Sequence, residues 1–291
     1  MKYIISEDVN LLAERELERL GSKGKIAPVF FEGLRKRLKK KLGKIFGEEK
    51  IEFIPAKEIR NGMENLIKEA AKKERQPVFL DRVYFPKAEL HLDITRSVDE
   101  SLQEKEETER FFCLPIKNQI KNLSDKMKEI ILADDVIFSG KGAVKVINLC
   151  REQGIEVKTF IAGISIGEGK ERIEKEGVLT QSVLYFEKVI DEICERDFFA
   201  GMPMSGRNVL HQKRNTGAPY FLPFGNPNKW ASIPKEAEED FSRFCLKQSV
   251  EIWEEIGRIR EKPVKCGEIE RLPIRAPQNG EYFTDYLKSL L

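Results

Sequence analysis

Residues 130–143 read IILADDVIFSGKGA, and this stretch decides the fold of the chain. Its first four residues are apolar, which is typical of a strand buried on both faces in a parallel sheet. Two carboxylates, Asp134 and Asp135, follow at the carboxyl end of that strand, where ligands of open α/β sheets bind. Residues 139–142 then supply a hydroxyl, an ammonium group and two glycines, so backbone N–H groups can surround an anion where a helix begins. The stretch predicts a strand, an anion-binding loop and a helix.

The flanking segments extend this pattern in both directions. Apolar residues recur at helical spacing from residue 143 to residue 150, and Gly154 follows as a stop. Residues 155–166 are apolar and β-branched, which indicates a second strand, and residues 117–128 form an amphipathic helix before the first strand. Alternating strands and helices are typical of an α/β fold. We therefore expect a mainly parallel twisted sheet flanked by helices.

Two other anion-loop motifs fail on inspection of this stretch. A phosphate loop of the Walker A type needs Gly at Asp135 and Ser or Thr at Gly142. The dinucleotide-binding fingerprint needs a third glycine at Lys145. A strand that ends in a solvated Asp pair is the simplest alternative, but it leaves the small-residue turn unexplained.

Residues 134–142, DDVIFSGKG, resemble the ribose-5-phosphate loop of the type I phosphoribosyltransferases. That loop has two acidic residues, two apolar residues, any residue, and then Thr or Ser, Gly, a variable residue, and Thr, Ser or Gly. In this family the acidic pair binds the ribose hydroxyls of phosphoribosyl pyrophosphate, so the resemblance implies this role for Asp134 and Asp135. It also implies that the following loop binds the 5-phosphate through Phe138, Ser139, Gly140, Lys141 and Gly142.

Three loop positions depart from the commonest family pattern. Lys141 stands where many members have Gly, although the 6-oxopurine enzymes also carry Lys there, and Gly142 replaces the commoner Thr or Ser. Phe138 stands where the 6-oxopurine enzymes have an Asp that handles a purine proton. The resemblance therefore argues against a 6-oxopurine acceptor.

The resemblance also implies a pyrophosphate loop after an early strand of the core and a flexible loop that closes over the substrate. Residues 77–85 and 90–96 are predicted strands, but the turns beside them lack the usual glycine. The candidates for binding pyrophosphate are Arg82, Lys87 and Arg96. The alternative is that they pair with neighbouring carboxylates at the surface. Residues 98–110 are highly charged, which is typical of an exposed helix or a loop, and could form the lid.

Residues 194–207 and 215–227 combine Gly, Pro, aromatic residues and paired charges in irregular backbone. Irregular segments of this length are uncommon inside compact domains unless they bind a ligand or a partner. We expect a hood over the acceptor base, and the alternative is a Pro-rich linker to a terminal helical piece. The candidate hood residues are Arg196, Asp197, Arg207, Tyr220 and Phe221, with Phe199 and Phe224 as further stacking rings.

These segments divide the chain into three predicted parts. Residues 1–75 form an N-terminal helical extension, residues 76–195 the phosphoribosyltransferase-like core, and residues 196–291 the hood and a helical region. Within the extension, residues 35–44 carry a basic cluster on an amphipathic helix. Such a cluster can contact RNA or a membrane, but a solvated helix face is the favoured interpretation.

Composition limits the remaining function classes. The 51 basic and 49 acidic residues leave a net charge of +2, so no global field attracts nucleic acid or a membrane. The five cysteines have no metal-ligand spacing, and no segment has the length of a membrane span or the character of an export signal. We expect a cytoplasmic protein with free thiols. The sequence leaves open whether the protein forms a homodimer.

The resemblance implies a pentosyltransferase reaction. Phosphoribosyl is transferred from phosphoribosyl pyrophosphate to a nitrogenous base with release of pyrophosphate, and Mg²⁺ accompanies the substrate. The acceptor base is not defined by the sequence. One alternative is a non-catalytic regulator that binds phosphoribosyl pyrophosphate or a nucleotide and uses the basic helix on RNA. Another is a phosphotransferase or phosphatase of a different α/β fold.

Overall fold

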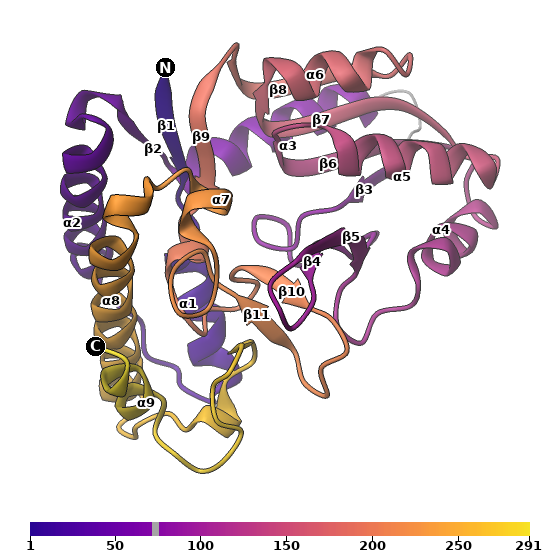
Figure 1. Ribbon diagram of the computed structural model, residues 1–291. Helices are drawn as coiled ribbons and strands as arrows, with labels where there is room; N and C mark the ends of the chain where they lie inside the picture. Colours follow the sequence, from indigo (N-terminus) through magenta and orange to yellow (C-terminus); the bar gives the residue numbers. More distant parts are fainter. Residues whose placement is uncertain (72–75) are drawn as a thin grey trace. The chain divides into compact units, whose positions relative to one another are not determined.

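The stretch with the tandem aspartates forms strand β6 (Glu129–Ile137) in the computed structural model, which describes residues 1–71 and 76–291. Strand β6 lies between β3 (Gln76–Phe79) and β7 (Glu156–Ile166), and β8 (Leu179–Phe186) completes the order β3-β6-β7-β8. All three pairings are parallel (Figure 1). The predicted α/β fold with a mainly parallel sheet is therefore confirmed.

Helices cover both faces of this sheet. They are α3 (Ala56–Ala71), α4 (Ile116–Ser124), α5 (Lys141–Glu152) and α6 (Gly167–Glu174). Alternate residues of β7 face opposite ways, so Phe160 shares a core with α4 and α5. Gly163 instead faces α3, because a Cβ there would lie 2.5 Å from Ile59. Apolar residues at helical spacing predict a helix over residues 56–73, and its last two residues lie outside the described residues.

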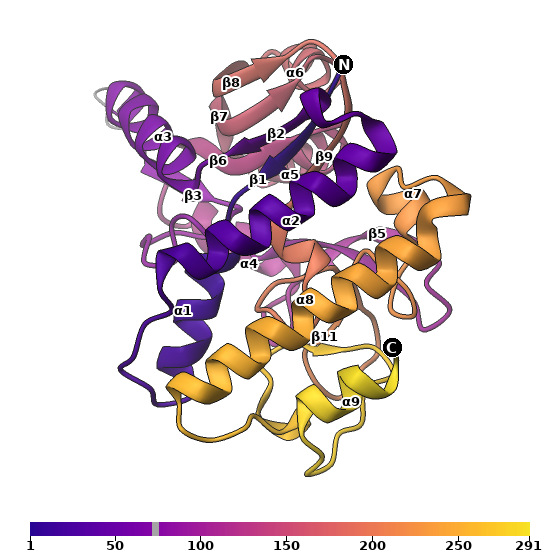
Figure 2. The same ribbon diagram turned by 90° about the vertical axis from the view of Figure 1, so that its left-hand side faces the viewer.

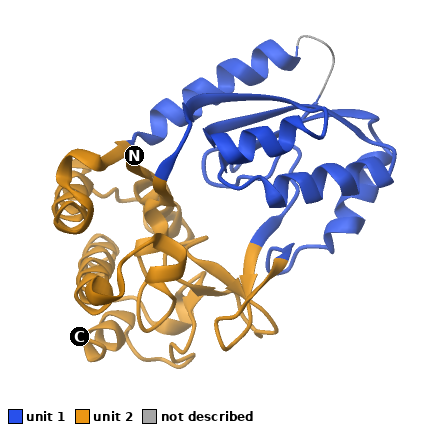
Figure 3. Cartoon of the chain, turned by 45° about the horizontal axis from the view of Figure 1, so that its top comes forward, with its two compact units in different colours: residues 1, 54–95, 107–189 blue, residues 2–53, 96–106, 190–291 orange. Residues whose placement is uncertain are grey.

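The chain divides into two units (Figure 3). Unit 1 holds residues 1, 54–95 and 107–189, and unit 2 holds residues 2–53, 96–106 and 190–291. This division differs from the three consecutive parts expected from the sequence. The predicted N-terminal extension contributes α3 to unit 1 and most of its other residues to unit 2.

Unit 2 joins the two ends of the chain. Strand β1 (Lys2–Ser6) pairs between β2 (Ile51–Ile54) and β9 (Val189–Cys194) in a three-stranded sheet. Helix α2 (Pro28–Phe46) lies beside α8 (Glu238–Ile259), where the Gln248 side chain donates a hydrogen bond to the Leu34 carbonyl (Figure 2). Long-range pairing and a shared core therefore bring the predicted extension and C-terminal region into one unit.

The second sheet has the strand order β12-β11-β10-β4-β5. Its members are β4 (Ile94–Val98), β5 (Glu104–Glu109), β10 (Arg207–Val209), β11 (Thr216–Ala218) and β12 (Leu272–Pro273). The charged residues expected to form a helix or a loop over 98–110 thus include the edge strand β5. Charged side chains are common on edge strands because they oppose pairing with other chains.

Unit 2 also holds shorter elements and the remaining helices. They are α1 (Val9–Arg19), α7 (Pro227–Ala231), α9 (Phe283–Ser289) and the 3₁₀ turns η1 (Glu48–Lys50), η2 (Glu195–Phe198), η3 (Lys235–Ala237) and η4 (Cys266–Glu268). In the described part of the chain, no helix combines the length and apolarity required to cross a bilayer.

The irregular segments expected to form a hood are part of the core of unit 2. Side chains of α8 satisfy their backbone: the Trp253 indole donates to the Ala200 carbonyl, and the Ser249 hydroxyl accepts from the Ala200 amide. Four aromatic side chains are at most 1% exposed: Phe199, Tyr220, Phe221 and Phe224. The stacking role expected for these rings therefore has no exposed ring face to support it, and the segments are not a linker.

The basic helix α2 is tied into unit 2 by ion pairs. Arg35 contacts Glu195 at 2.9 Å and Glu7 at 3.1 Å, and the Glu195 side chain is fully buried. Arg37 pairs with Glu251 at the surface. These contacts give part of the basic cluster a structural role.

The difference between these two arginines can be measured. Arg35→Ala should lower the free energy of unfolding by about 3 kcal/mol, because it leaves the buried Glu195 carboxylate without its partner. Arg37→Ala, the matched control, should cost about 0.5 kcal/mol because its pair is exposed. Denaturant unfolding of both variants checks this, and equal losses would contradict a structural role for the Arg35 pair.

Candidate functional site

The tandem aspartates lie on β6 within unit 1. The strand continues to Ile137, so Asp134 and Asp135 belong to it rather than to the loop. Their side chains alternate between the two faces, and each carboxylate accepts a hydrogen bond from the next backbone amide, at 3.0 Å from Asp135 and at 2.9 Å from Val136. The residues are both partly exposed. Each can therefore meet a ligand from its own side of the strand.

A third carboxylate, Asp81, joins them from the neighbouring strand. The amide of Leu80 donates to the Ala133 carbonyl at 2.8 Å, which places the end of β3 beside Asp134. Asp81 is buried and accepts hydrogen bonds from the amides of Val83 and Tyr84, both at 2.7 Å. This local bonding also explains why the strand predicted over 77–85 ends early.

Burial and charge crowding act together on Asp134. Burial raises its pKa well above the usual range, and the carboxylates of Asp135 and Asp81 raise it further. Arg110 opposes this effect with its positive charge, and its guanidinium donates to the Leu80 carbonyl at 3.3 Å. Neither Asp81 nor Arg110 was predicted from the sequence to lie beside the tandem aspartates. The pattern that identifies Asp134, a carboxylate at the end of an apolar run, also holds for Asp81 and could have placed it at the site. No sequence pattern marks Arg110.

The loop predicted to bind an anion connects β6 to α5. Gly140 has a left-handed φ of 71° and precedes the first residue of the helix, Lys141. The Ser139 hydroxyl accepts from the Lys141 amide at 3.5 Å, and the Lys141 side chain is exposed. The first amides of a helix lack intrahelical partners and carry partial positive charge. The loop therefore has the backbone arrangement that binds an anion.

Helix α6 fixes the outer side of this loop. A Cβ on Gly140 would lie 2.7 Å from the Gly169 carbonyl oxygen, and a Cβ on Gly169 would lie 2.3 Å from the Phe138 carbonyl oxygen. The Arg172 guanidinium donates to the Ser139 carbonyl at 2.7 Å. Two glycines thus allow the backbones to approach closely, and the loop is held in place before any ligand binds.

The other side of the loop meets the end of β5. The Lys145 ammonium donates to the Glu107 carbonyl at 3.1 Å, and the Glu107 carboxylate oxygen would lie 3.2 Å from a Cβ at Gly142. Glu107 of β5 therefore lies against the start of α5. This part of the segment predicted to be a lid is a strand in contact with the loop.

The three pyrophosphate candidates have different surroundings, each described within its own unit. Arg82 forms two hydrogen bonds to Asp93, both at 2.8 Å, which is the surface pairing named as the alternative. Lys87 is exposed in unit 1. Arg96 belongs to unit 2, where it contacts the Tyr220 ring. Their role in binding pyrophosphate stays a prediction.

Two predicted hood residues have structural contacts in unit 2. Arg196 pairs with the buried carboxylate of Asp8, and Phe221 packs edge-on against Phe224. The other three, Asp197, Arg207 and Tyr220, lie together near Arg96.

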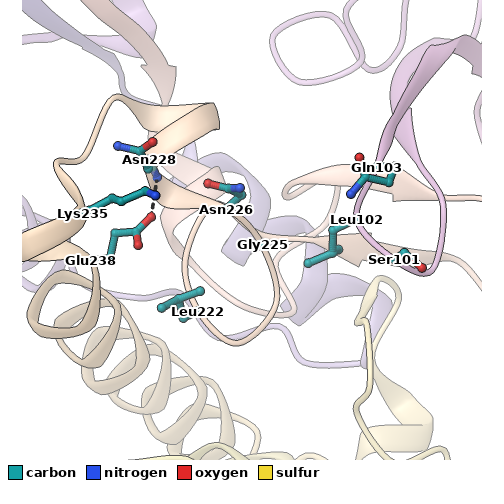
Figure 4. Close-up of a pocket in the computed structure, with 9 residues that line it drawn as sticks. All are labelled: Ser101, Leu102, Gln103, Leu222, Gly225, Asn226, Asn228, Lys235 and Glu238. Carbon is teal, nitrogen blue, oxygen red and sulfur yellow. Dashed lines mark hydrogen bonds between the residues drawn. The ribbon is translucent and has the colours of Figure 1, made fainter.

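Unit 2 also contains a pocket of about 310 Å³ (Figure 4). It is lined by Ser101, Leu102, Gln103, Leu222, Gly225, Asn226, Asn228, Lys235 and Glu238. Several of its polar groups already have partners: Asn226 accepts from the Lys229 amide, and Glu238 accepts from the Asn228 amide. Its lining therefore indicates no particular ligand.

A bound Mg²⁺ ion is compatible with the residues of unit 1. In the part of the chain that the structure describes, no three His, Cys, Asp or Glu side chains form a ready-made metal site. Mg²⁺ is usually held by one or two carboxylates together with substrate phosphates and water. Asp134 and Asp135 can supply such carboxylates when a pyrophosphate is present.

No family model matches the chain. Two curated proteins are similar in sequence to part of it. One is the orotate phosphoribosyltransferase of Aquifex aeolicus, with 33% identity over 76 residues, and the other is the hypoxanthine/guanine phosphoribosyltransferase of Ferroglobus placidus, with 32% identity over 75 residues. These matches cover 26% and 24% of this chain, and only 42% and 40% of the relatives' own lengths. The resemblance to phosphoribosyltransferases is confirmed, and the two relatives are named for different bases.

Solved phosphoribosyltransferase structures are also similar to part of the chain. The orotate phosphoribosyltransferase of Aeropyrum pernix is 17% identical with a TM-score of 0.29, over 44% of this chain and 68% of that one. The purine phosphoribosyltransferase of Pyrococcus horikoshii is 14% identical with a TM-score of 0.30, over 47% of this chain and 87% of that one.

The close approach at Gly140 predicts an unequal response of two glycines. Gly140 and Gly154 have nearly the same φ, 71° and 72°, but only Gly140 faces a neighbouring backbone. Gly154→Ala should cost about 1 kcal/mol for the left-handed backbone alone. Gly140→Ala should cost clearly more because the methyl group meets Gly169. Denaturant unfolding measures both, and equal losses would contradict the tight packing of the loop on α6.

The crowded carboxylates predict a pH-dependent gain in stability. Because the pKa of Asp134 is raised in the folded state, the folded protein binds more protons than the unfolded chain, and stability falls as pH rises above about 4. Asp134→Asn removes this cost. The variant should be more stable than the wild type at pH 7, and the difference should disappear below about pH 4. Thermal unfolding across pH tests this, and a less stable variant at pH 7 would contradict it.

Proposed function

We propose that this chain is a phosphoribosyltransferase that transfers phosphoribosyl from phosphoribosyl pyrophosphate to a nitrogenous base. The observation that carries the proposal is the sequence Asp134–Asp135 on a parallel strand, followed directly by the Gly140 turn and the start of α5. The sequence match to two phosphoribosyltransferases supports the same reaction.

In the proposed complex, the sugar and its phosphate bind to adjacent groups. The carboxylates of Asp134 and Asp135 accept hydrogen bonds from the ribose hydroxyls. The 5-phosphate lies at the start of α5, where the amides of Gly142 and Ala143 and the Lys141 ammonium can donate to it. This arrangement fixes the position of C1 of the ribose relative to an incoming base.

During transfer, the bond from C1 to the pyrophosphate oxygen breaks as a ring nitrogen of the base forms a bond to C1. The sugar carries positive charge in the transition state, and the nearby carboxylates stabilise that charge. The proton of the attacking ring nitrogen then passes to water. Asp134 or Asp135, together with the substrate phosphates, would hold Mg²⁺, which would neutralise charge on the departing pyrophosphate.

Cell location and cysteine state belong to the same proposal. All five cysteines are free thiols, and all except Cys113 are buried. Reduced thiols are the rule in the cytoplasm, where we place the protein.

The second candidate is a regulator that binds phosphoribosyl pyrophosphate without turning it over. The observation in its favour is the pairing of Arg82 with Asp93. Because its guanidinium already binds a carboxylate, Arg82 is less available to bind pyrophosphate. The RNA contact imagined for such a regulator has less support, since Arg35 and Arg37 of α2 are already ion-paired.

Ligand binding and turnover separate these candidates. Phosphoribosyl pyrophosphate with Mg²⁺ should raise the Tm of the wild type, because a ligand that binds only the folded state stabilises it. Pyrophosphate should then be released with one member of a panel of purine and pyrimidine bases. Stabilisation without release from any base would favour the regulator, and no stabilisation would contradict both candidates.

The double variant Asp134→Asn/Asp135→Asn should lose this ligand-dependent increase in Tm. Asp125→Asn, at an exposed position on the same unit, is the matched control and should keep it. If the double variant responded to the ligand as the wild type does, the site would be assigned to the wrong residues.

A further inference from the structure

Two arginines lie side by side on the second sheet, within unit 2. Strands β10 and β4 are parallel, with Asn208 opposite Ser97 and Val209 opposite Val98. The preceding residues, Arg207 and Arg96, are therefore neighbours on the same face. Both guanidinium groups lie over the Tyr220 ring, at 5.8 Å and 5.6 Å from its centroid. Like charges at neighbouring positions of a sheet are unfavourable unless an anion offsets them.

Two polar atoms of this cluster have no hydrogen-bond partner among the described residues. They are Nε of Arg207 and the hydroxyl oxygen of Tyr220, and both atoms are buried. A buried polar group without a partner is costly, so such groups usually mark a site for water or a ligand. Burial raises the pKa of Tyr220 to about 12, so its hydroxyl keeps its proton and can donate.

The nearby carboxylates do not satisfy Arg207. Glu104 accepts hydrogen bonds from the Trp230 indole at 3.0 Å and lies 3.2 Å from the Lys229 ammonium, but 3.8 Å from Arg207. Asp197 accepts from the Gly206 amide at 2.7 Å and lies 3.8 Å from Arg96. The 3.8 Å between Glu104 and Arg207 is too long for a direct hydrogen bond. Other titratable groups that act on this cluster include Arg196, Asp191 and Cys194.

We propose that Arg207, Arg96 and the Tyr220 hydroxyl form a binding site for an oxyanion, a phosphate or carboxylate group, in unit 2. Guanidinium groups bind such anions through paired N–H donors. The aromatic floor keeps the guanidinium planes in place: Arg207 also lies over the Trp230 ring at 4.9 Å. The Arg96 side chain is 53% exposed, which gives a ligand access to the site.

This site is distinct from the phosphate loop of the proposed function, because its residues belong to unit 2 and the loop belongs to unit 1. Calorimetric titration of the full chain with inorganic phosphate should therefore show two binding events per chain. Tyr220→Phe should weaken one of them about tenfold, since it removes a single donor to the anion. Gly142→Glu should remove the other by placing a carboxylate at the start of α5.

The Tyr220→Phe variant has a second readout that a structural hydroxyl would not give. In the absence of anions its Tm should equal or exceed that of the wild type, because removing a buried hydroxyl that has no partner breaks no hydrogen bond. Tyr282→Phe, at a tyrosine that is 42% exposed, is the matched control and should change neither binding nor Tm. Arg207→Gln should weaken the same event as Tyr220→Phe.

A parallel titration with acetate distinguishes the two ligand chemistries. Acetate that competes for the Tyr220-dependent event indicates a carboxylate ligand, and phosphate binding without competition indicates a phosphate ligand. A wild type with only the Gly142-dependent event would overturn this inference and leave the proposed function intact. A wild type with only the Tyr220-dependent event would support this inference and contradict the phosphate loop of the proposed function.

Discussion

The repulsion among three carboxylates at the ends of β3 and β6 is the constraint on which unit 1 depends. Parallel pairing of the two strands sets Asp81 beside Asp134, and β6 itself carries Asp135. Such crowding opposes folding, so the apolar residues of the sheet must offset it. Ribose hydroxyls and a cation would relieve it on binding. In the proposed function, the carboxylates that make this strand end costly to the free protein would be the groups that bind the sugar hydroxyls.

The loop after β6 shows how the same unit prepares a site without a ligand. Gly140 supplies the left-handed turn and, with Gly169, the close approach of α6. Arg172 then holds the Ser139 carbonyl from outside. The amides at the start of α5 are positioned by covalent geometry and packing, so binding need not order them. In the proposed function, phosphate affinity would then depend on these fixed dipoles together with the Lys141 ammonium.

Local patterns in the sequence predicted the strand, loop and helix around residues 130–150, because periodicity and small residues act within a few positions. They did not predict contacts between distant segments. Asp81 and Arg110 join the site through strand pairing, and residues 2–53 share a core with residues 190–291 through β1 and α8. The irregular backbone was harder to interpret: its aromatic rings suggested base stacking, and the structure places Phe221 and Phe224 fully buried in the core of unit 2.

A crystal structure of the full chain with phosphoribosyl pyrophosphate and Mg²⁺ would show where the sugar and its phosphate bind. We expect the ribose hydroxyls within hydrogen-bond distance of Asp134 and Asp135, and the 5-phosphate on the amides between Gly140 and Ala143. A ligand bound elsewhere, with the β6–α5 loop unchanged and in contact only with protein, would contradict this expectation.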